Sequence, residues 1–459
     1  MKFVLPGLLL AMLLGALDQT IMAPALPAVA TALGGLDQMP AVITAYLVAA
    51  TVVMPVYGKL GDRYGRKPMM QAAIVIFVTG AVLCALAGSM SQFVAFRALQ
   101  GVGGGGLMIG AQAIVGELVS PRERGRYLGL IGAAYVVAAV GGPLLGGFIV
   151  DRFDWRWIFA VYPPLGLIAL VLLTVTLRLP KPVGRAPIDV AGALTLAVAV
   201  VGVVLLGQTR EPVFLAVALA GVVAWLVSAR YAADPILPLR LFRDRAFAVP
   251  VTISMLVGFA LFGTVSYMPA YLQIALRSTA TQAGLLVTAL MAGVLITTIV
   301  SGRLITRTGR YKPYPVAGTA VAALGLALLP FAGGAAAFAA VMLLIGLGIG
   351  LVMQVMVLAA QNAVEYADLG TATSSVTFMR QIGASAGVAL AGALITWRFA
   401  GDIPVAGPAD LPDGVRAAFA EAVPPVLGGM APLLAVAFVL ALVLPARPLR
   451  TTAYVEERA

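Results

Sequence analysis

The sequence predicts an all-α polytopic membrane protein. Of the 459 residues, 61% are hydrophobic and only 11% are charged, and the mean hydropathy is +1.02. Soluble domains are about 45–50% apolar and about 25% charged. Apolar stretches of about 20 residues, the length that crosses a bilayer core as a helix, recur along almost the whole chain. No segment of the sequence is both long enough and polar enough to be a soluble domain.

Fourteen stretches qualify as membrane spans, and short polar connections separate them. In chain order we predict them at 4–33, 41–58, 69–88, 92–118, 126–150, 156–177, 189–208, 212–230, 247–274, 283–302, 314–331, 336–361, 372–397 and 425–445. An even number of spans puts both termini on the same side of the membrane.

Positive charge predicts which side that is. If the N-terminus is cytoplasmic, 22 of the 30 Lys and Arg residues fall in cytoplasmic segments and six fall outside. The remaining two, Arg97 and Arg380, lie within spans. Because cytoplasmic loops of membrane proteins are enriched in Lys and Arg, we expect both termini to be cytoplasmic.

A charged stretch after the second span has a second copy later in the chain. Residues 58–68 read GKLGDRYGRKP, and residues 302–313 read GRLITRTGRYKP after the tenth span. Gly302, Arg307 and Gly309 align with Gly58, Arg63 and Gly65. When the two spans between 179 and 244 are left out, the distance in sequence between the two copies suits a repeat of six helices. Internal repeats of this kind are typical of secondary transporters.

The first copy resembles the loop signature of the major facilitator superfamily, and other segments resemble its fourteen-span drug/proton antiporter branch (QacA/EmrB-like). These segments are LDQTIMAPALP (17–27), RALQGVGGGGL (97–107), GGPLLGG (141–147), DWRWIFAVYPPLG (154–166) and DPILPLRLFRDRAF (234–247). The resemblance implies the major facilitator fold, with two six-helix bundles and two inserted helices. We therefore expect a first bundle at 1–178, an inserted pair packed on the outside at 179–244, and a second bundle at 245–459.

Asp18, Arg97 and Glu117 are the candidate proton-coupling residues. Asp18 lies near the middle of the first span, where a carboxylate costs about 2.5–3.5 kcal/mol. It can carry the proton, bind a cationic compound, or do both by competition; the alternative is a structural hydrogen bond to a neighbouring helix. The resemblance makes Arg97 a partner in proton transfer, because its charge would lower the pKa of a nearby acid. Its position also permits an arginine that snorkels to the interface.

The charged loop motif is the candidate gate. We expect Asp62 to join an ion network with Arg63 or Arg66 and with Glu117, or to meet a helix N-terminus of the second bundle. The network would latch the inner side while the outer side is open. A cluster that only sets topology is the alternative, but topology needs neither Asp62 nor the glycines. The motif residues are Gly58, Asp62, Arg63, Gly65, Arg66 and Lys67.

Two glycine-rich segments are expected to serve packing and bending. The run at 101–106 lets the fourth helix approach its neighbours. It lacks the Gly-Lys-Ser/Thr ending of a phosphate loop, so ATP is not expected to drive the protein. In the fifth helix, Pro143 predicts a kink, and the glycines would let it slide against its partner in the other bundle. That motif, which the family links to antiport, comprises Gly142, Pro143, Gly146 and Gly147.

A cavity between the bundles is expected to bind substrate. Its candidate polar and aromatic lining residues are Tyr46, Gln100, Gln112, Phe259, Phe262, Tyr267, Tyr271, Gln354, Gln361 and Phe378. The spans of the second bundle contain no carboxylate, so a dication would meet few counter-charges. We therefore expect lipophilic substrates that are neutral or carry a single positive charge.

These observations favour proton-coupled export of drugs or natural products across the bacterial cytoplasmic membrane, with a role in multidrug efflux and antibiotic resistance. Self-resistance to one metabolite and a lipid or lysolipid flippase stay open, and a nutrient uptake permease is disfavoured by GGPLLGG through resemblance. The sequence has no histidine and one cysteine, so an enzyme with a usual metal centre is not expected. The proton gradient replaces a cofactor. We expect the partners to be lipophilic substrates, protons and the lipid bilayer, without nucleic acid. A monomer is the expected functional unit, and the need for a periplasmic adaptor stays open.

Overall fold

A computed structural model describes residues 3–35, 38–179, 189–209, 211–275, 277–278, 280–399 and 413–451 of the protein. Within these ranges the regular elements are helices, and fourteen segments are long and apolar enough to cross a membrane. This confirms the predicted class and the predicted number of spans.

The helices form two groups and an inserted pair. The first group comprises α1 (Leu5–Leu33), α2 (Met39–Tyr64), α3 (Arg66–Ala85), α4 (Met90–Leu118), α5 (Pro121–Arg152), α6 (Trp157–Ala160) and α7 (Tyr162–Thr176). The inserted pair comprises α8 (Val190–Thr209) and α9 (Pro212–Tyr231). The second group comprises α10 (Arg245–Val265), α11 (Met268–Ala275), α12 (Ala280–Thr308), α13 (Pro313–Leu328), α14 (Ala335–Gly350), α15 (Met353–Ala363), α16 (Leu369–Phe399), α17 (Asp413–Gly428) and α18 (Ala431–Val443).

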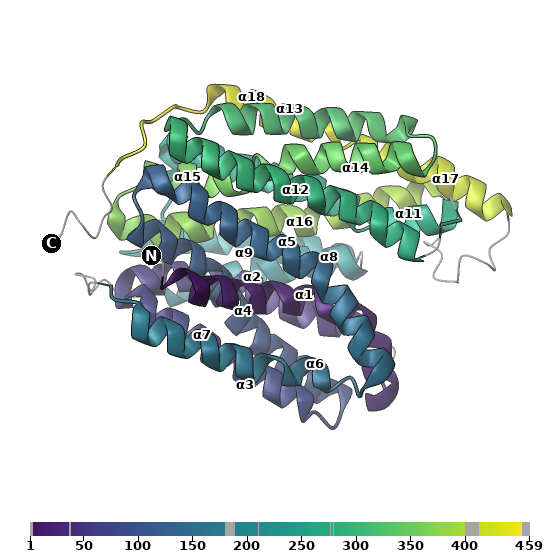
Figure 1. Ribbon diagram of the computed structural model, residues 1–459, viewed down its shortest axis with the longest axis horizontal. Helices are drawn as coiled ribbons and strands as arrows, with labels where there is room; N and C mark the ends of the chain where they lie inside the picture. The colour runs from purple at the N-terminus through teal and green to yellow at the C-terminus, as the bar shows by residue number, and fades with distance from the viewer. Residues whose placement is uncertain are drawn as a thin grey trace.

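The two groups lie side by side and meet mainly through two helix pairs. Figure 1 shows α1–α4, α6 and α7 in the lower part of the molecule and α11–α18 in the upper part, with α5 running obliquely across the middle. Across this boundary α5 contacts α12, and α2 contacts α16. The described chain begins and ends at the same end of the bundle, at the left in Figure 1. We call this the latch end, because the charged motif at 58–67 lies there. It is the end for which the sequence predicts a cytoplasmic location.

Two helices continue beyond their predicted ends. We expected the second and tenth spans to stop at residues 58 and 302, but α2 reaches Tyr64 and α12 reaches Thr308. Each helix then stops at a glycine with positive φ, Gly65 at 97° and Gly309 at 70°. Glycine adopts this conformation without the steric penalty that other residues meet. The motif is therefore mostly helical, and its two copies share the same helix end.

The inserted helices differ in their surroundings. Helix α8 contacts both α2 and α16 besides α9, so it lies against both groups rather than only on the outside. The Thr44 hydroxyl of α2 donates a hydrogen bond of 2.5 Å to Gln208 Oε1 of α8. Helix α9 fits the predicted peripheral position better, because Leu215, Leu219 and Val223 are exposed on its surface. In a membrane such a surface faces lipid.

Glycines in α4 allow unusually close contacts with two neighbouring helices. An added Cβ atom at Gly103 would lie 2.6 Å from the Cα of Phe77 in α3, and one at Gly101 would lie 3.0 Å from the Cα of Tyr46 in α2. Ordinary carbon contacts need about 3.5–4.0 Å. The predicted packing role of this glycine run is confirmed, because any side chain would force the helices apart.

We expect Gly103→Val to destabilise the protein by about 1–3 kcal/mol or more, the usual cost of overpacking. Gly141→Val is the matched control, because among the described residues no atom beyond the adjacent backbone of its own helix lies within 4 Å of a Cβ at that position. The thermal unfolding midpoints of both purified variants measure the effect. Equal midpoints for the two variants would contradict this account of α4.

Candidate functional site

Asp18 of α1 and Arg97 of α4 form a fully buried ion pair. Arg97 Nη1 donates hydrogen bonds of 2.7 Å to Asp18 Oδ2 and 2.9 Å to Oδ1. The exposed fractions of the two side chains are 0% for Asp18 and 2% for Arg97. Two of the three residues predicted to couple protons therefore lie in direct contact.

The surroundings of this pair hold both partners in place. Gln100 accepts from Arg97 Nη1 at 2.8 Å and donates to Asp18 Oδ1 at 3.0 Å. The Arg97 guanidinium lies 4.5 Å from the centre of the Tyr46 ring, a cation–π contact. Arg97 thus points into the helix bundle and does not snorkel to the interface in this conformation.

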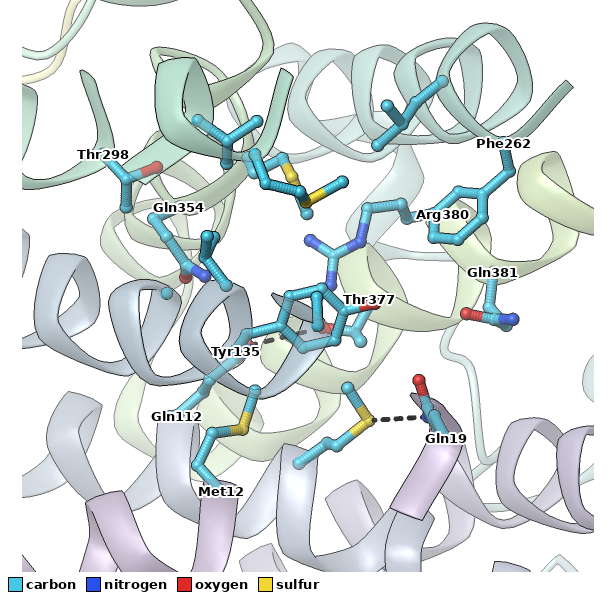
Figure 2. A pocket seen from close by; sticks show the side chains of 18 of the residues that line it. Met12, Gln19, Gln112, Tyr135, Phe262, Thr298, Gln354, Thr377, Arg380 and Gln381 are labelled. Carbon is cyan, nitrogen blue, oxygen red and sulfur yellow. Dashed lines mark hydrogen bonds between the residues drawn. The ribbon is translucent and has the colours of Figure 1, made fainter. Parts of the chain in front are cut away.

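A central cavity of about 240 Å³ lies between the two groups of helices (Figure 2). Its walls come from α1, α2, α4 and α5 on one side and from α10, α12, α15 and α16 on the other. Gln19 and Thr20, which directly follow Asp18, line it. Most of the wall is apolar, with methionines at Met12, Met54, Met108, Met291 and Met353. Unbranched, polarisable methionines adapt to differently shaped ligands.

Three of the ten predicted cavity residues line this cavity, namely Gln112, Phe262 and Gln354. Tyr46 and Gln100 instead surround the ion pair. Gln361 donates to the Gln112 carbonyl oxygen at 3.2 Å, which joins the two groups of helices. The remaining four, Phe259, Tyr267, Tyr271 and Phe378, are outside the cavity wall. The prediction failed there because helix faces follow from packing, which single residues do not reveal.

Three of these four residues, Tyr267, Tyr271 and Phe378, pack inside the second group of helices. Tyr271 lies with its ring centre 5.5 Å from that of Phe338, and the Tyr267 hydroxyl donates to the Val388 carbonyl oxygen at 3.0 Å. Phe378 is buried in the hydrophobic core. These side chains serve the interior of the second group.

Arg380 and Tyr135 line the cavity, and no functional role was predicted for either. Figure 2 shows Arg380 reaching from α16 towards Tyr135 of α5. A signal for Arg380 was present in the sequence, because an ionisable residue within a membrane span marks a candidate functional site. Tyr135 has no comparable signal, since it is one aromatic residue in an apolar stretch.

At the latch end, Asp62 of α2 binds the N-terminus of α16. Its Oδ1 accepts from the Gly370 amide and its Oδ2 from the Thr371 amide, each at 2.8 Å. The Thr371 hydroxyl also donates to Oδ2 at 3.0 Å. A helix N-terminus offers free N–H groups and a partial positive charge, so a carboxylate is well placed there.

Arg66 connects Asp62 to Glu117 of α4. Its Nη2 lies 2.5 Å from Asp62 Oδ1, and its Nε lies 2.8 Å from Glu117 Oε2. Tyr366 lies just before α16 in the chain, and its hydroxyl donates to Glu117 Oε1. We call Asp62, Arg66, Glu117 and the N-terminus of α16 the latch. Both predicted partners of Asp62 are therefore present together, although the gating role itself stays a prediction.

The other residues of the motif lie beside the latch. Gly58 packs so closely on Gly370 that an added Cβ would lie 2.7 Å from the Gly370 carbonyl oxygen. Lys67 donates to the Thr174 carbonyl oxygen at 2.7 Å, and the Arg63 guanidinium lies 5.0 Å from the centre of the Tyr64 ring. Arg66, not Arg63, carries the ion pairs.

Glu117 lies far from the residues with which it was grouped for proton coupling. Arg97 and Glu117 are twenty positions apart on the same helix α4, which corresponds to about 30 Å along its axis. The structure thus places Glu117 with the latch and separates it from the Asp18–Arg97 pair.

The glycine motif of α5 packs against α1 of its own group rather than against the other group. A Cβ atom at Gly142 would meet the hydroxyl of Thr20, and one at Gly146 would meet the carbonyl oxygen of Ile21. The Thr20 hydroxyl also donates to the Ala138 carbonyl oxygen at 2.9 Å. Pro143 lies inside this helix, and nothing lies within 4 Å of a Cβ at Gly147. The expected partner in the other bundle was therefore wrong for this segment.

An earlier part of α5 does contact the other group. A Cβ at Gly125 would lie 3.0 Å from the Gly302 carbonyl oxygen, and one at Gly129 would lie 2.9 Å from that of Thr298. Helix α5 thus touches α12 near the latch end and α1 next to Asp18. In the ranges that the structure describes, no group of three or more His, Cys, Asp and Glu side chains is placed to hold a metal ion.

Comparison with known proteins agrees with this architecture. The sequence profile described as "Major Facilitator Superfamily" matches residues 8–388. The Multidrug transporter protein MdtP of Bacillus subtilis is 34% identical over 405 residues, covering 85% of this chain and 75% of its own. An uncharacterized MFS-type transporter of Mycobacterium tuberculosis is 37% identical over 417 residues, covering 86% of this chain. The chain spans only 59% of that relative's length.

A solved structure shows the same fold. The proton:xylose symporter XylE superposes with a TM-score of 0.69 over 100% of this chain and 98% of its own, at 16% sequence identity. At that identity the likeness concerns the fold alone. The profile match and the Bacillus subtilis relative show that the chain belongs to the Major Facilitator Superfamily, and the solved structure shares its fold.

Proposed function

We propose that this transporter exports lipophilic small molecules across the bacterial cytoplasmic membrane in exchange for protons. The observation that carries the proposal is the buried Asp18–Arg97 pair beside the central cavity. The Bacillus subtilis relative named a multidrug transporter supports export of drug-like compounds. The apolar, methionine-rich wall of the cavity supports lipophilic substrates.

Asp18 is suited to carry the proton because a single cation, Arg97, compensates its negative charge. In this conformation the carboxylate has Arg97 and Gln100 as hydrogen-bond donors. Protonation of Asp18 removes the attraction to Arg97, and loss of the proton restores it. The pair therefore has two arrangements that differ by one proton.

A change at Asp18 can reach the cavity through α1. Thr20 lies two residues further along this helix, lines the cavity and bonds to Ala138 of α5. The close contacts of Gly142 and Gly146 hold α5 on the same segment of α1. A shift of α1 on protonation would therefore move α5, which also provides Tyr135 and Val136 to the cavity.

The latch provides the second element of alternating access. Here it joins the two groups at one end of the molecule through Asp62, Arg66 and Glu117. With the predicted orientation, this conformation is closed towards the cytoplasm. Release of the latch would then open the cavity to the inner side, where substrate and the released proton exchange.

Inverted membrane vesicles with an acidified interior test the proposal. A pH-sensitive dye reports protons that leave the vesicles as lipophilic anions, neutral compounds and cations are added. We expect some compounds to release protons from vesicles that contain the transporter and not from vesicles that lack it. If no compound separates the two preparations, proton-coupled export should be abandoned.

A further inference from the structure

Arg380 is a buried arginine that forms no ion pair with an acid among the residues that the structure describes. Its exposed fraction is 9%, and its Nη1 has no hydrogen-bond partner among the described residues. Other buried arginines differ. Arg66 and Arg97 form ion pairs with carboxylates, and Arg124 donates to the Val119 carbonyl oxygen at 2.9 Å. Arg380 is therefore available to a group that enters the cavity.

The guanidinium is also directed into the cavity. Figure 2 shows it extending from α16 between Phe262 and Gln354 towards the ring of Tyr135. A buried guanidinium with free donors in a mostly apolar space is costly unless water or an anion satisfies it. A planar carboxylate fits such a fork especially well, because it accepts two parallel hydrogen bonds.

The remaining cavity wall offers no negative charge to balance Arg380. Among the described residues that line it, none is Asp or Glu, and the polar groups are amides, hydroxyls and one phenol. Asp18, which was expected to carry the proton, to bind a cationic compound, or to do both, is absent from the wall and already bonded to Arg97. A cation in this space would meet repulsion from Arg380 without a compensating carboxylate.

We propose that the substrates are lipophilic anions, whose carboxylate or similar acidic group binds Arg380 while an apolar body lies against the methionines and Phe262. This inference rests on the proposed function and names the substrate class of the same cavity. The Tyr135 hydroxyl is available on the facing helix as a further donor to the anion.

The test compares three probes that share one apolar body. They are 4-(2-naphthyl)butanoate, its methyl ester, and the matching 4-(2-naphthyl)butyl trimethylammonium cation. Equilibrium dialysis measures their binding to the purified transporter in nanodiscs of phosphatidylcholine, with empty nanodiscs subtracted. We expect the carboxylate to bind about 10- to 100-fold more tightly than the ester, the range that a charge-assisted hydrogen bond gives, and the cation to bind most weakly.

Variants of one helix assign the preference to Arg380. Arg380→Gln should bring the carboxylate and the ester to similar affinity, and Arg380→Lys should keep part of the preference because it keeps the charge. Arg380→Glu should favour the cation. Arg398→Gln is the matched control: it removes the same charge from the same helix at an exposed position outside this cavity, and it should leave the preference unchanged.

Two results would overturn the proposal. One is a wild-type protein that binds the carboxylate no better than the ester, which tests the idea even if Arg380→Gln fails to fold. The other is a carboxylate preference that survives in a folded Arg380→Gln variant.

Binding in nanodiscs does not depend on a proton gradient, so it separates the substrate class from proton exchange. Selective binding of the carboxylate without any proton release in vesicles would keep the substrate class and remove proton exchange. Proton release by the ester and the cation, as strong as that by the carboxylate, would keep exchange and remove the substrate class.

Discussion

Asp18→Asn abolishes proton-coupled transport if Asp18 carries the exchanged proton. Asparagine has nearly the same shape as aspartate, but it neither binds nor releases a proton near neutral pH. In inverted vesicles we expect proton release by active compounds to fall to the level of vesicles without transporter. Asp151→Asn is the control, because it removes an exposed carboxylate from α5 and should leave transport unchanged.

The same substitution also has a structural cost that must be separated from its effect on transport. It leaves the Arg97 charge buried without a counter-charge, and breaking one partner of a buried pair costs about 3–5 kcal/mol. The double variant Asp18→Asn with Arg97→Gln removes both charges and should recover most of the thermal stability. We expect it to stay uncoupled.

Proton release and thermal stability therefore rank the variants differently, because both variants should lose coupling but only the single variant should lose most of the stability. A stable double variant without coupling supports a functional carboxylate. Normal proton release by Asp18→Asn, measured with comparable amounts of protein in the membrane, would show that the pair is only a structural contact.

Asp62→Asn shifts the balance between the two conformations away from the latched one. Asparagine loses the charge and can accept with only one oxygen, so at least one bond to the Gly370 or Thr371 amide is lost. Losing a charge-assisted hydrogen bond costs about 1.5–3 kcal/mol, or about a 10- to 100-fold change in the conformational ratio.

Cysteine labelling measures this shift in a background without Cys84, the one cysteine of the chain. Ser374→Cys reports on the latched contact because Ser374 is buried against Gly58. Gln19→Cys reports on the cavity. We expect Asp62→Asn to speed labelling at position 374 and to slow labelling at position 19 from the outer side.

A control charge deletion defines what counts as a change. Glu123→Gln removes an exposed carboxylate from the first turn of α5 at the same end of the molecule. It should leave both labelling rates as they are. If Asp62→Asn behaves like Glu123→Gln, the latch does not control the conformational balance.

Hydrophobicity and charge predicted the spans because each span comprises about twenty residues, so that a few misjudged residues do not change the result. The helix ends were less accurate. The charges after Gly58 suggested a loop, yet α2 continues to Tyr64 because its charged side chains find partners outside this helix. Lys59, for example, pairs with Asp234, and Asp62 pairs with Arg66. The sequence pattern of one helix does not show which residues elsewhere in the chain will pair with its side chains.

The candidate site shows the same division. Asp18 and Arg97 could be singled out, Asp18 because a carboxylate within a span is rare and Arg97 through the family resemblance, but their direct contact was not predicted. The contact of Asp62 with Thr371, 309 positions away, could be stated only as one of two options. The cavity wall was predicted least well, because Phe262 lines it and Phe259, three positions earlier, does not. The uncompensated charge of Arg380 became evident only when its neighbours were known.

Proton release from the purified protein tests the central claim, that Asp18 carries the exchanged proton, most directly. An active compound is added to wild type and to Asp18→Asn in a weakly buffered detergent solution, and a pH indicator records the protons that appear. The account predicts release from wild type and none from a folded Asp18→Asn variant. Equal release from both would contradict it and would place the exchanged proton on another group.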